Sequence, residues 1–452
     1  MTSIIASKAL LPDGWADDVL LRVRDGLIDD VRPGAAPDDD ATKVGCVIPG
    51  LCNAHSHAFQ RALAGRTEER SPAGHDNFWT WRDRMYRLAA TLDPDLLRAI
   101  ARQVYMEMLQ SGYTTVVEFH YLHRDPATKT AGMQMFGALG DAARQAGIRL
   151  AYVPVLYERA GFHAAGPEGP QELFALSLAE FLEHHHEART QVSEKLSVGI
   201  GAHSLRAVSA PSLEAIAEAG RQAGGPIHLH IAEQQREVDQ CLAAYERRPV
   251  RWLLENIGVD EQWCLVHATH MDADESKHLA GSGAVVCVCP STEANLGDGL
   301  FPLADYLAHG GRLAIGSDSH ISINPFEELR WLEYGQRLAT QTRNITSLRT
   351  SHVGRELFER AVEGGAQASG QEAAGLCRGA PADLVALYAD DPMLTGHGDD
   401  SRLDALVFSG YRLPIEGVMV HGEWVVVDGE HRSGAETRDA FRAAVRALGA
   451  RG

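Results

Sequence analysis

The chain has 452 residues, of which 45% are hydrophobic and 23% are charged, as is ordinary for globular proteins. Its net charge is -19, from 42 Lys and Arg against 61 Asp and Glu. Such a chain lacks the basic face that nucleic acid or an anionic membrane would need, so we expect neither partner. No signal-peptide pattern or long apolar run occurs, and the 7 cysteines are scattered. The sequence therefore predicts a cytoplasmic protein with reduced thiols.

Short strand-like segments lie at both ends of the chain. Residues 1–48 contain alternating apolar residues separated by Asp-Gly turns. Residues 378–452 contain similar segments with a hairpin at 421–422, and they end in a stretch with helical periodicity. Because the two ends share this pattern, we expect residues 1–48 and 378–452 to form one small β-sandwich domain that carries the C-terminal helix.

Residues 49–377 have a different pattern, in which apolar strand-like segments alternate with helical ones. Eight such strand segments occur, beginning with CVIPGLCNAH and ending with RLAIGSDSH. Several are apolar throughout, as expected for parallel strands that helices cover on both faces. Eight consecutive strand–helix units predict an α/β fold with a TIM-like (β/α)8 barrel over residues 49–377.

Histidine and aspartate residues stand at the ends of several of these strands. His55 and His57 end the first strand, His230 the fifth, His267 the sixth and Asp318 the eighth. The carboxyl ends of barrel strands meet at one mouth, where barrel enzymes have their active sites. Three histidines and one aspartate suit zinc or ferrous iron with a coordination position open for water. His-x-His alone would more simply be a polar turn, but agreement at several strand ends predicts a metal site.

A run of three histidines, in the segment EHHHEART, is a weaker candidate for a metal site. Three successive residues cannot share one face of a helix. We therefore interpret this segment as a solvated helix face.

The motifs together resemble the amidohydrolase superfamily, a group of metal-dependent hydrolase barrels. The resemblance extends over essentially the whole chain and rests on PGLCNAHSH, HIAE, CPSTEANLGDG and GSDS. It implies that His55, His57, His230 and Asp318 hold one divalent metal ion. The lysine that marks the binuclear branch is missing from VGIGAHSLRAV, near the end of the fourth strand. We therefore expect one Zn²⁺ per chain, with Fe²⁺ as the alternative.

The same resemblance implies three catalytic residues. Glu233 would carry protons to the leaving nitrogen, Asp318 would accept a proton from the attacking water, and His267 would orient that water. A bound divalent metal lowers the pKa of water toward neutrality. Attack on an amidine-like or aromatic C=N carbon then leads to loss of ammonia, which needs a proton.

Segments around the predicted mouth resemble one family of this superfamily, the formimidoylglutamate deiminases. They are HAFQRALAG, NFWTWRDRMYR, VEFHYLH and HSLRAV. The resemblance implies a homodimer that hydrolyses a small anionic amidine, N-formimidoyl-L-glutamate, to N-formyl-L-glutamate and ammonia in histidine degradation. Arginine binds carboxylate through paired hydrogen bonds, and Tyr and Gln add directed ones. The implied substrate residues are Gln60, Arg82, Tyr121, His203 and Arg206.

Two other functions stay open at this point. A purine, pterin or similar ring could be the substrate of a deaminase in the same branch, although two arginines suit a dicarboxylate better than a neutral ring. A non-catalytic scaffold would have lost a ligand or Glu233, and the sequence keeps all of them. The substrate residues also have structural alternatives, since Arg82 could form a surface ion pair and Tyr121 could be a packed aromatic of the barrel rim.

Overall fold

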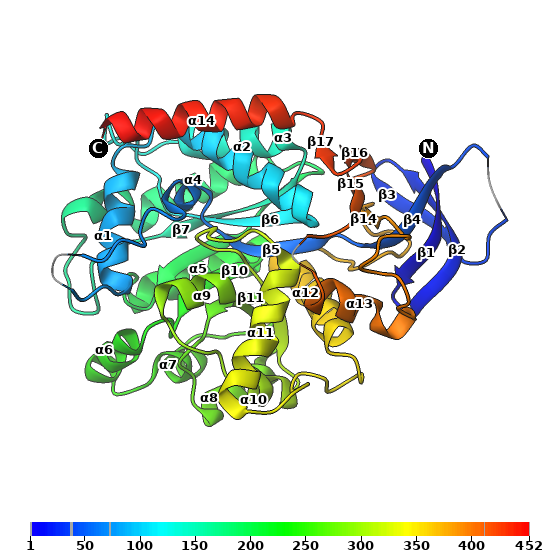
Figure 1. The fold of residues 1–452 in the computed structure, drawn as a ribbon. Helices are drawn as coiled ribbons and strands as arrows, with labels where there is room; N and C mark the ends of the chain where they lie inside the picture. The colour runs from blue at the N-terminus through cyan, green and yellow to red at the C-terminus, as the bar shows by residue number, and fades with distance from the viewer. Residues whose placement is uncertain (1, 37–38, 72–73, 411, 452) are drawn as a thin grey trace.

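A parallel barrel forms the centre of the computed structural model, which describes residues 2–36, 39–71, 74–410 and 412–451 (Figure 1). The strand order is β13-β12-β11-β10-β9-β7-β6-β5, and β8 pairs with β7. The strands are β5 Leu51–Ser56, β6 Tyr113–His120, β7 Arg149–Leu156, β8 Leu196–Val198, β9 Ile200–Ser204, β10 Ile227–Ile231, β11 Trp263–His267, β12 Val285–Val288 and β13 Arg312–Ile315. Each of the eight predicted segments contains a barrel strand, so the predicted (β/α)8 barrel is confirmed.

Helices surround the barrel, and their ends follow local sequence signals. In α2 (Pro94–Ser111) the Asp93 side chain accepts the Leu96 N–H at 2.8 Å, and Gly112 ends the helix with a φ of 101°. The other helices that follow barrel strands or extend their loops are η1 Ala58–Leu63, α1 Phe78–Ala89, α3 Gln134–Ala146, η2 Gly169–Leu173, α4 Leu178–Arg189, α5 Ala210–Ala223, α6 Gln235–Tyr245, α7 Pro249–Asn256, α8 Ala273–Ser282, α9 Pro290–Leu296, α10 Leu303–Ala308, α11 Pro325–Thr340 and α12 Val353–Ser369.

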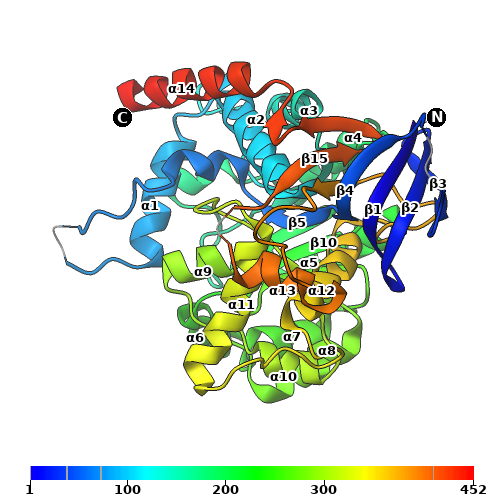
Figure 2. The same cartoon turned by 45° about the vertical axis from the view of Figure 1, so that its right-hand side comes forward.

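A second sheet combines strands from both ends of the chain, as predicted. Its order is β17-β16-β15-β14-β4-β1-β2-β3, and Figure 2 shows the N-terminal and C-terminal strands side by side. All pairings are antiparallel except that of β1 with β4. The strands are β1 Thr2–Leu11, β2 Gly14–Arg24, β3 Leu27–Arg32, β4 Thr42–Pro49, β14 Leu384–Leu387, β15 Ile415–Val420, β16 Glu423–Val427 and β17 Glu430–His431. We predicted a sandwich, and these strands are hydrogen-bonded as one continuous sheet.

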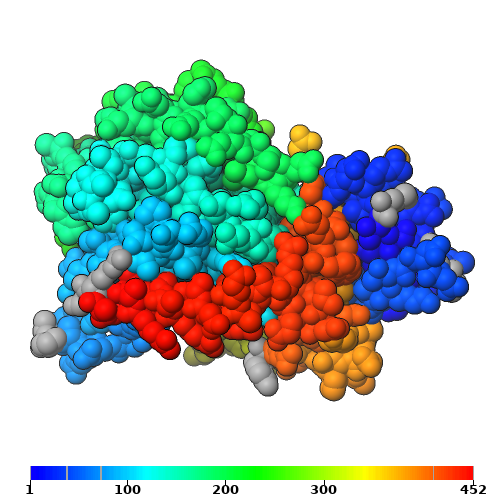
Figure 3. Space-filling view, turned by 90° about the horizontal axis from the view of Figure 1, so that it is seen from above, coloured from blue at the N-terminus to red at the C-terminus, as the bar shows by residue number. Residues whose placement is uncertain are grey.

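Two C-terminal helices lie outside this sheet. The helix α14 (Gly434–Arg451) packs along α2, where Arg102 and Glu436 form an ion pair of 2.8 Å. Figure 3 shows α14 on the surface of the molecule, away from the N-terminal strands. The helix α13 (Asp399–Phe408) packs on α12 of the barrel. The segment that we grouped with the small domain therefore also contacts the barrel.

The barrel closes between its first and last strands by very few backbone contacts. One isolated bridge joins Ser56 to Asp318 in the described part of the chain. The His57 N–H donates to the Asp318 carbonyl, and the Asp318 N–H donates to the His55 carbonyl, both at 3.0 Å. This approach needs a glycine at position 316, because a Cβ there would lie 2.8 Å from the Cβ of His55. The closure therefore brings three predicted metal ligands together.

The structure also bears on the predictions made for the run of three histidines, for the cysteines and for membrane-spanning segments. The interpretation of residues 184–186 as a solvated face was wrong for two of them, since His184 and His185 are buried and His184 contacts the Tyr152 hydroxyl at 3.0 Å. All 7 cysteines are free thiols. No helix among the described residues is long and apolar enough to cross a membrane.

Candidate metal and substrate site

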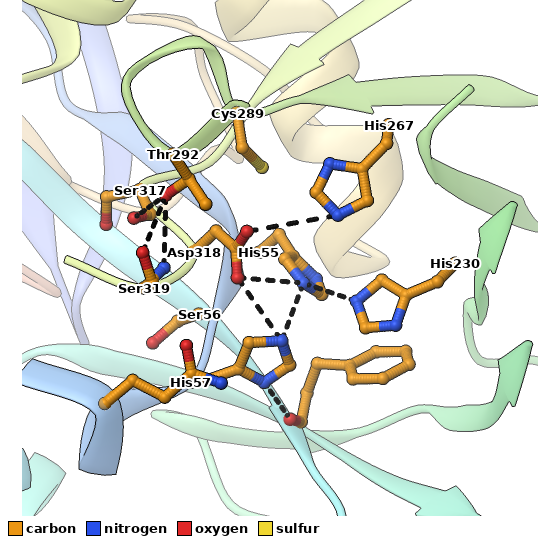
Figure 4. A network of polar contacts seen from close by, with 12 residues as sticks. His55, Ser56, His57, His230, His267, Cys289, Thr292, Ser317, Asp318 and Ser319 are labelled. Carbon is orange, nitrogen blue, oxygen red and sulfur yellow. Dashed lines mark hydrogen bonds and ion pairs between the residues drawn. The ribbon is translucent and has the colours of Figure 1, made fainter. Parts of the chain in front are cut away.

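The four predicted metal ligands meet in a buried cluster (Figure 4). The Nε2 atom of His55 lies 3.1 Å from that of His57 and 2.9 Å from that of His230. The Oδ1 atom of Asp318 lies 3.4 Å from His57 Nε2 and 3.7 Å from His55 Nε2. The structure thus places His55, at the end of β5, between two groupings of possible ligands. One contains His230 on β10 and His267 on β11, and the other contains His57, just after β5, and Asp318, after β13.

The chemistry of this cluster fits a divalent metal ion. His57 Nδ1 donates to the Phe119 carbonyl at 2.8 Å, so the Nε2 lone pair of the neutral ring faces the cluster. Burial lowers the pKa of His57 to about 3, and it also lowers the pKa values of His55 and His230. Neutral imidazole nitrogens at these separations are stable only with a proton or a cation between them. Ligands of tetrahedral zinc, each at about 2.0–2.1 Å, lie roughly 3.3 Å apart, which the observed distances approach.

Left-handed backbone at the strand ends aims side chains into the mouth. His267 ends β11 with a φ of 70°, Asp318 has a φ of 45°, and Ala232, which precedes Glu233, has a φ of 48°. This conformation costs a residue other than glycine roughly 1–2 kcal/mol. Such strain is common where a fold fixes functional side chains, and here it turns three catalytic candidates toward one point.

His267 stands among carboxylates. Its Nε2 atom lies 3.9 Å from Glu233 Oε1 and 3.9 Å from Asp318 Oδ2, and its Nδ1 atom lies 3.1 Å from Glu293 Oε1. Burial lowers the pKa of His267, but these carboxylates outweigh it and raise the pKa to about 10. Burial raises the pKa of Asp318 to about 7 and also raises that of Glu233. The geometry therefore pairs one imidazolium with two carboxyl groups whose affinity for a proton is increased by burial.

Glu293 is a partner of His267 that we did not identify from the sequence. It lies on α9, within the motif CPSTEANLGDG, and also accepts the Cys289 N–H at 2.9 Å. The motif carried no local signal that its carboxylate would reach a histidine at the end of β11.

A cavity lies beside the cluster, lined mainly by aromatic and polar side chains, as small-molecule sites are. All five predicted substrate residues line it, together with Glu233, His267 and Asp318. Seven other lining residues were not predicted as substrate contacts, and they are Phe78, Trp81, Met85, Tyr86, Tyr157, Phe174 and Leu296. One signal was available for Tyr86, because it lies four residues after Arg82 on the same face of α1.

Two arginines enter this cavity from different elements. Arg82 comes from α1, which lies at the end of the barrel away from the small sheet (Figure 1), and Arg206 follows β9. Buried N–H groups of both guanidiniums have no hydrogen-bond partner among the described residues. The Trp79 ring lies 4.5 Å from Arg82 Cζ and 5.6 Å from Arg206 Cζ. Arg82 makes none of the surface ion pairs found among those residues.

The other predicted substrate residues complete a polar wall. Gln60 Nε2 donates to the Tyr121 hydroxyl at 3.0 Å, which leaves that hydroxyl able to donate in turn. The His203 ring lies 5.4 Å from the Tyr121 ring. Burial, then the nearby Arg206, lowers the pKa of His203 well below its ordinary value, so the ring is neutral.

Comparison with known proteins agrees with this geometry. Residues 46–425 match the amidohydrolase family, and residues 1–43 match the family described as "Formimidoylglutamate deiminase HutF, N-terminal domain". The chain belongs to the amidohydrolase family. It is 46% identical to a formimidoylglutamate deiminase of Pseudomonas aeruginosa over 99% of each chain, which places it in that branch of the family.

More distant relatives share the fold. A 5-methylthioadenosine/S-adenosylhomocysteine deaminase of Natronomonas pharaonis is 28% identical over 94% of this chain and 92% of its own. A solved amidohydrolase from Brucella melitensis has a TM-score of 0.95 and 40% identity, with 99% of this chain and 100% of that chain covered. An atrazine chlorohydrolase from Arthrobacter aurescens, solved with zinc, is similar in fold alone, with a TM-score of 0.86 at 20% identity over 98% of this chain and 100% of its own. The predicted amidohydrolase barrel is confirmed.

Proposed function

We propose that the chain hydrolyses N-formimidoyl-L-glutamate to N-formyl-L-glutamate and ammonia, as a step of histidine degradation. The observation that carries this proposal is the pair Arg82 and Arg206, whose unpaired N–H groups are buried around the same cavity as the histidine cluster. Arg206 is buried and Arg82 is half-buried, and a glutamate moiety offers one carboxylate to each of these cations. The 46% identity to a formimidoylglutamate deiminase supports the same substrate.

We assign His55, His57, His230 and Asp318 to one divalent metal ion, with Zn²⁺ as the proposed metal and Fe²⁺ as the alternative. The convergence of three Nε2 atoms and one carboxylate oxygen supports this assignment. When bound, such an ion supplies a water of lowered pKa and polarises the carbon under attack.

The remaining groups move protons and stabilise charge. We assign Asp318 to take a proton from the attacking water and Glu233 to deliver a proton to the amidine nitrogen as the C–N bond breaks and ammonia leaves. The raised pKa values of both carboxyl groups support these roles. His267, held by Glu293, would stabilise negative charge on the oxygen of the tetrahedral carbon.

Substrate orientation would come from the polar wall of the cavity. Arg82 and Arg206 would each bind a carboxylate, while Tyr121 and Gln60 would direct the amidine toward Glu233. The aromatic side chains that line the rest of the cavity would exclude water from the reacting carbon.

A ring deaminase is the second candidate. Tyr86, Tyr157 and Phe174 could stack on a planar base, and the Natronomonas pharaonis relative is a deaminase by name. Arg82 and Arg206 favour the dicarboxylate, because a neutral base would leave their buried N–H groups without acceptors. A scaffold without activity is disfavoured by the complete set of ligands and proton carriers.

The decisive test is ammonia release by the purified, zinc-loaded protein. N-formimidoyl-L-glutamate would be supplied in parallel with guanine, adenosine and cytosine. We expect rapid release from the first compound alone. Release from a base instead would overturn the substrate but keep the hydrolytic site, and silence with all four compounds, with zinc bound, would overturn the activity. The proposed homodimer would be tested by the mass in solution, against a chain mass of 49.0 kDa.

A further inference from the structure

A chain of hydrogen bonds lies behind the metal ligands, at the seam where the barrel closes. The Ser56 hydroxyl lies 2.6 Å from Glu118 Oε2 and 3.1 Å from His320 Nε2. His320 Nδ1 lies 2.9 Å from Ser317 Oγ, and the Asn53 amide reaches the same oxygen at 2.5 Å. All five side chains are 0% exposed. Figure 4 shows Ser56 and Ser317 next to Asp318.

At one end of this series of hydrogen bonds, Glu118 determines which atom of each pair is the donor. Burial raises the pKa of Glu118 to about 7, while hydrogen bonds from Ser56, Ala58 and Tyr105 oppose that rise and favour the ionised form. In that form the carboxylate only accepts hydrogen bonds, and it accepts from the Ser56 hydroxyl, from the Tyr105 hydroxyl at 3.2 Å and from the Ala58 N–H at 2.8 Å. Ser56 has one hydroxyl hydrogen, which it donates to Glu118. Its oxygen must therefore accept from His320 Nε2.

The same direction continues to the other end of the chain. When His320 donates from Nε2 as a neutral ring, its Nδ1 atom accepts the Ser317 hydroxyl hydrogen. The Ser317 oxygen is then free to accept from the Asn53 amide, while the Asn53 carbonyl accepts the Ser317 N–H at 3.0 Å. Every donor in the chain thus has an acceptor, which is the condition for a buried polar network to be stable.

The position of this chain explains why it matters. Asn53 and Ser56 lie on β5, Glu118 lies on β6, and Ser317 and His320 follow β13. Backbone pairing between β5 and β13 is limited to the bridge described above. None of the five side chains lines the cavity.

We propose that Glu118 is a positioning residue for the metal site. By accepting from Ser56 it fixes the direction of the chain that ties β5 to β13, and so holds His55 and His57 at the correct distance from Asp318. The inference rests on the metal site proposed above. Groups that hydrogen-bond a metal ligand directly are commonly worth about 10- to 100-fold in metal affinity or activity. Glu118 acts one step further out, through Ser56 and Ala58, which are the chain neighbours of His55 and His57.

The test variant is Glu118→Gln, which keeps the shape of the side chain. If the glutamine N–H₂ takes the place of Oε1, it faces the Ala58 N–H, and two donors oppose each other. If it takes the place of Oε2, it donates to the Ser56 oxygen, so that Ser56 donates to His320 and His320 donates to Ser317. The Ser317 hydroxyl hydrogen is then left without an acceptor. Either outcome leaves a buried donor unsatisfied and loosens the seam.

Three measurements separate positioning from general stability. The Zn²⁺ dissociation constant would be measured by competition with a chromophoric chelator, the ligand geometry by the visible spectrum of the Co²⁺-loaded protein, and stability by thermal unfolding without metal. We expect Glu118→Gln to weaken Zn²⁺ binding by roughly 10- to 100-fold and to change the Co²⁺ spectrum. Activity with saturating metal should fall in kcat, with KM unchanged, because Glu118 does not line the cavity.

Glu333→Gln is the matched control. Glu333 on α11 is also 0% exposed and accepts the Thr346 hydroxyl at 2.7 Å and the Thr346 N–H at 3.1 Å, but none of its hydrogen-bond partners belongs to the seam. It should lower stability and leave Zn²⁺ affinity and the Co²⁺ spectrum as in the native protein.

The inference fails if Glu118→Gln folds and binds Zn²⁺ within about twofold of the native protein, or if Glu333→Gln loses the same affinity. Should Glu118→Gln not fold, Ser56→Ala breaks the hydrogen-bonded series between Glu118 and His320 and is judged by the same three measurements. A native protein that binds no Zn²⁺ would overturn the metal site itself, and the inference with it.

Discussion

The buried histidines of the site differ in charge because their neighbours differ. His57 and His267 are both buried, yet burial lowers the pKa of His57 to about 3, whereas carboxylates outweigh burial and raise the pKa of His267 to about 10. His57 lies among other imidazoles with one carboxylate nearby, since Asp318 Oδ1 is 3.4 Å from its Nε2 atom, while His267 faces the carboxylates of Glu233, Glu293 and Asp318. The first arrangement suits a neutral ligand and the second a cation that stabilises negative charge.

Replacement of Glu233 by Gln tests the proposed proton transfer. The variant should keep its metal, because no ligand is removed, and kcat should fall by roughly 10²- to 10⁴-fold because the leaving nitrogen loses its proton source. Metal content and steady-state rates are the measurements. Rapid turnover by a metal-loaded Glu233→Gln protein would contradict the assignment.

Replacement of Arg206 by Met tests the anion site. Charge-assisted hydrogen bonds contribute about 1.5–3 kcal/mol each, so KM for the dicarboxylate should rise by roughly 10- to 150-fold. Arg236→Met is the control, because Arg236 is exposed and stacks on the same Trp79 ring at 4.5 Å without lining the cavity. An unchanged KM in Arg206→Met would remove this arginine from the substrate contacts.

The pH dependence of metal binding should reflect loss of a proton from the Asp318 carboxyl group. Burial raises its pKa to about 7 in the metal-free protein, so below pH 7 a proton must leave before the carboxylate can bind a cation. Affinity should therefore fall as the pH drops from 7 to 5, by up to about tenfold per pH unit. His57, with a pKa of about 3, adds no competing proton in this range. Calorimetry in buffers of different ionisation enthalpy would count the released proton, and affinity independent of pH would refute this reading.

At the scale of helices and strands, close packing behind the barrel holds the strand ends in place. The helix α12 lies against β13, and Gly364 on this helix faces the Leu313 carbonyl so closely that a Cβ there would lie 2.0 Å from the oxygen. A side chain at position 364 would push α12 away from the strand that leads to Asp318. The contact between α12 and β13 therefore requires a glycine at position 364.

Gly364→Ala should therefore destabilise the fold by about 1–3 kcal/mol, the usual cost of overpacking. Gly140→Ala on α3 is the matched control, because nothing lies within 4 Å of its added Cβ. That variant should gain roughly 0.5–1 kcal/mol, since alanine favours the helix. Urea unfolding measures both changes, and equal effects of the two substitutions would show that contact with Leu313 is unimportant.

Across the whole molecule, the proposed metal site joins segments that are distant in sequence. Its proposed ligands come from the end of β5 and the residue after it, from β10 and from the segment after β13, and the cavity is completed by α1. A ligand that binds only the folded chain stabilises it by mass action. A metal ion bound at this site would therefore stabilise the folded barrel.

Removal of metal should accordingly lower the melting temperature. Free Zn²⁺ at about 1,000 times its dissociation constant would contribute about 4 kcal/mol, which is lost on chelation and regained on addition. His230→Ala should show no comparable response, because it lacks one ligand. Equal stabilisation of both proteins by Zn²⁺ would place the metal elsewhere. Calorimetry with defined free Zn²⁺ makes the comparison.

Local sequence patterns were enough to predict the barrel, the terminal sheet and the residues at the strand ends. Strand and helix periods are local properties, and carboxyl ends of parallel strands must share one mouth, so His55, His57, His230 and Asp318 could be grouped from the sequence. Arg82 and Arg206 were found through resemblance, and the structure places both at the cavity.

The partners of the buried side chains became known from the folded structure. Nothing local in the sequence joins Glu293 to His267, Glu118 to Ser56 or α14 to α2, because each contact depends on how distant segments pack. The burial of His184 and His185 was missed for the same reason. Periodicity in the sequence shows that one face of a helix or strand is buried. The packing of the whole chain determines which residues cover that face and whether its histidines and carboxyl groups are charged.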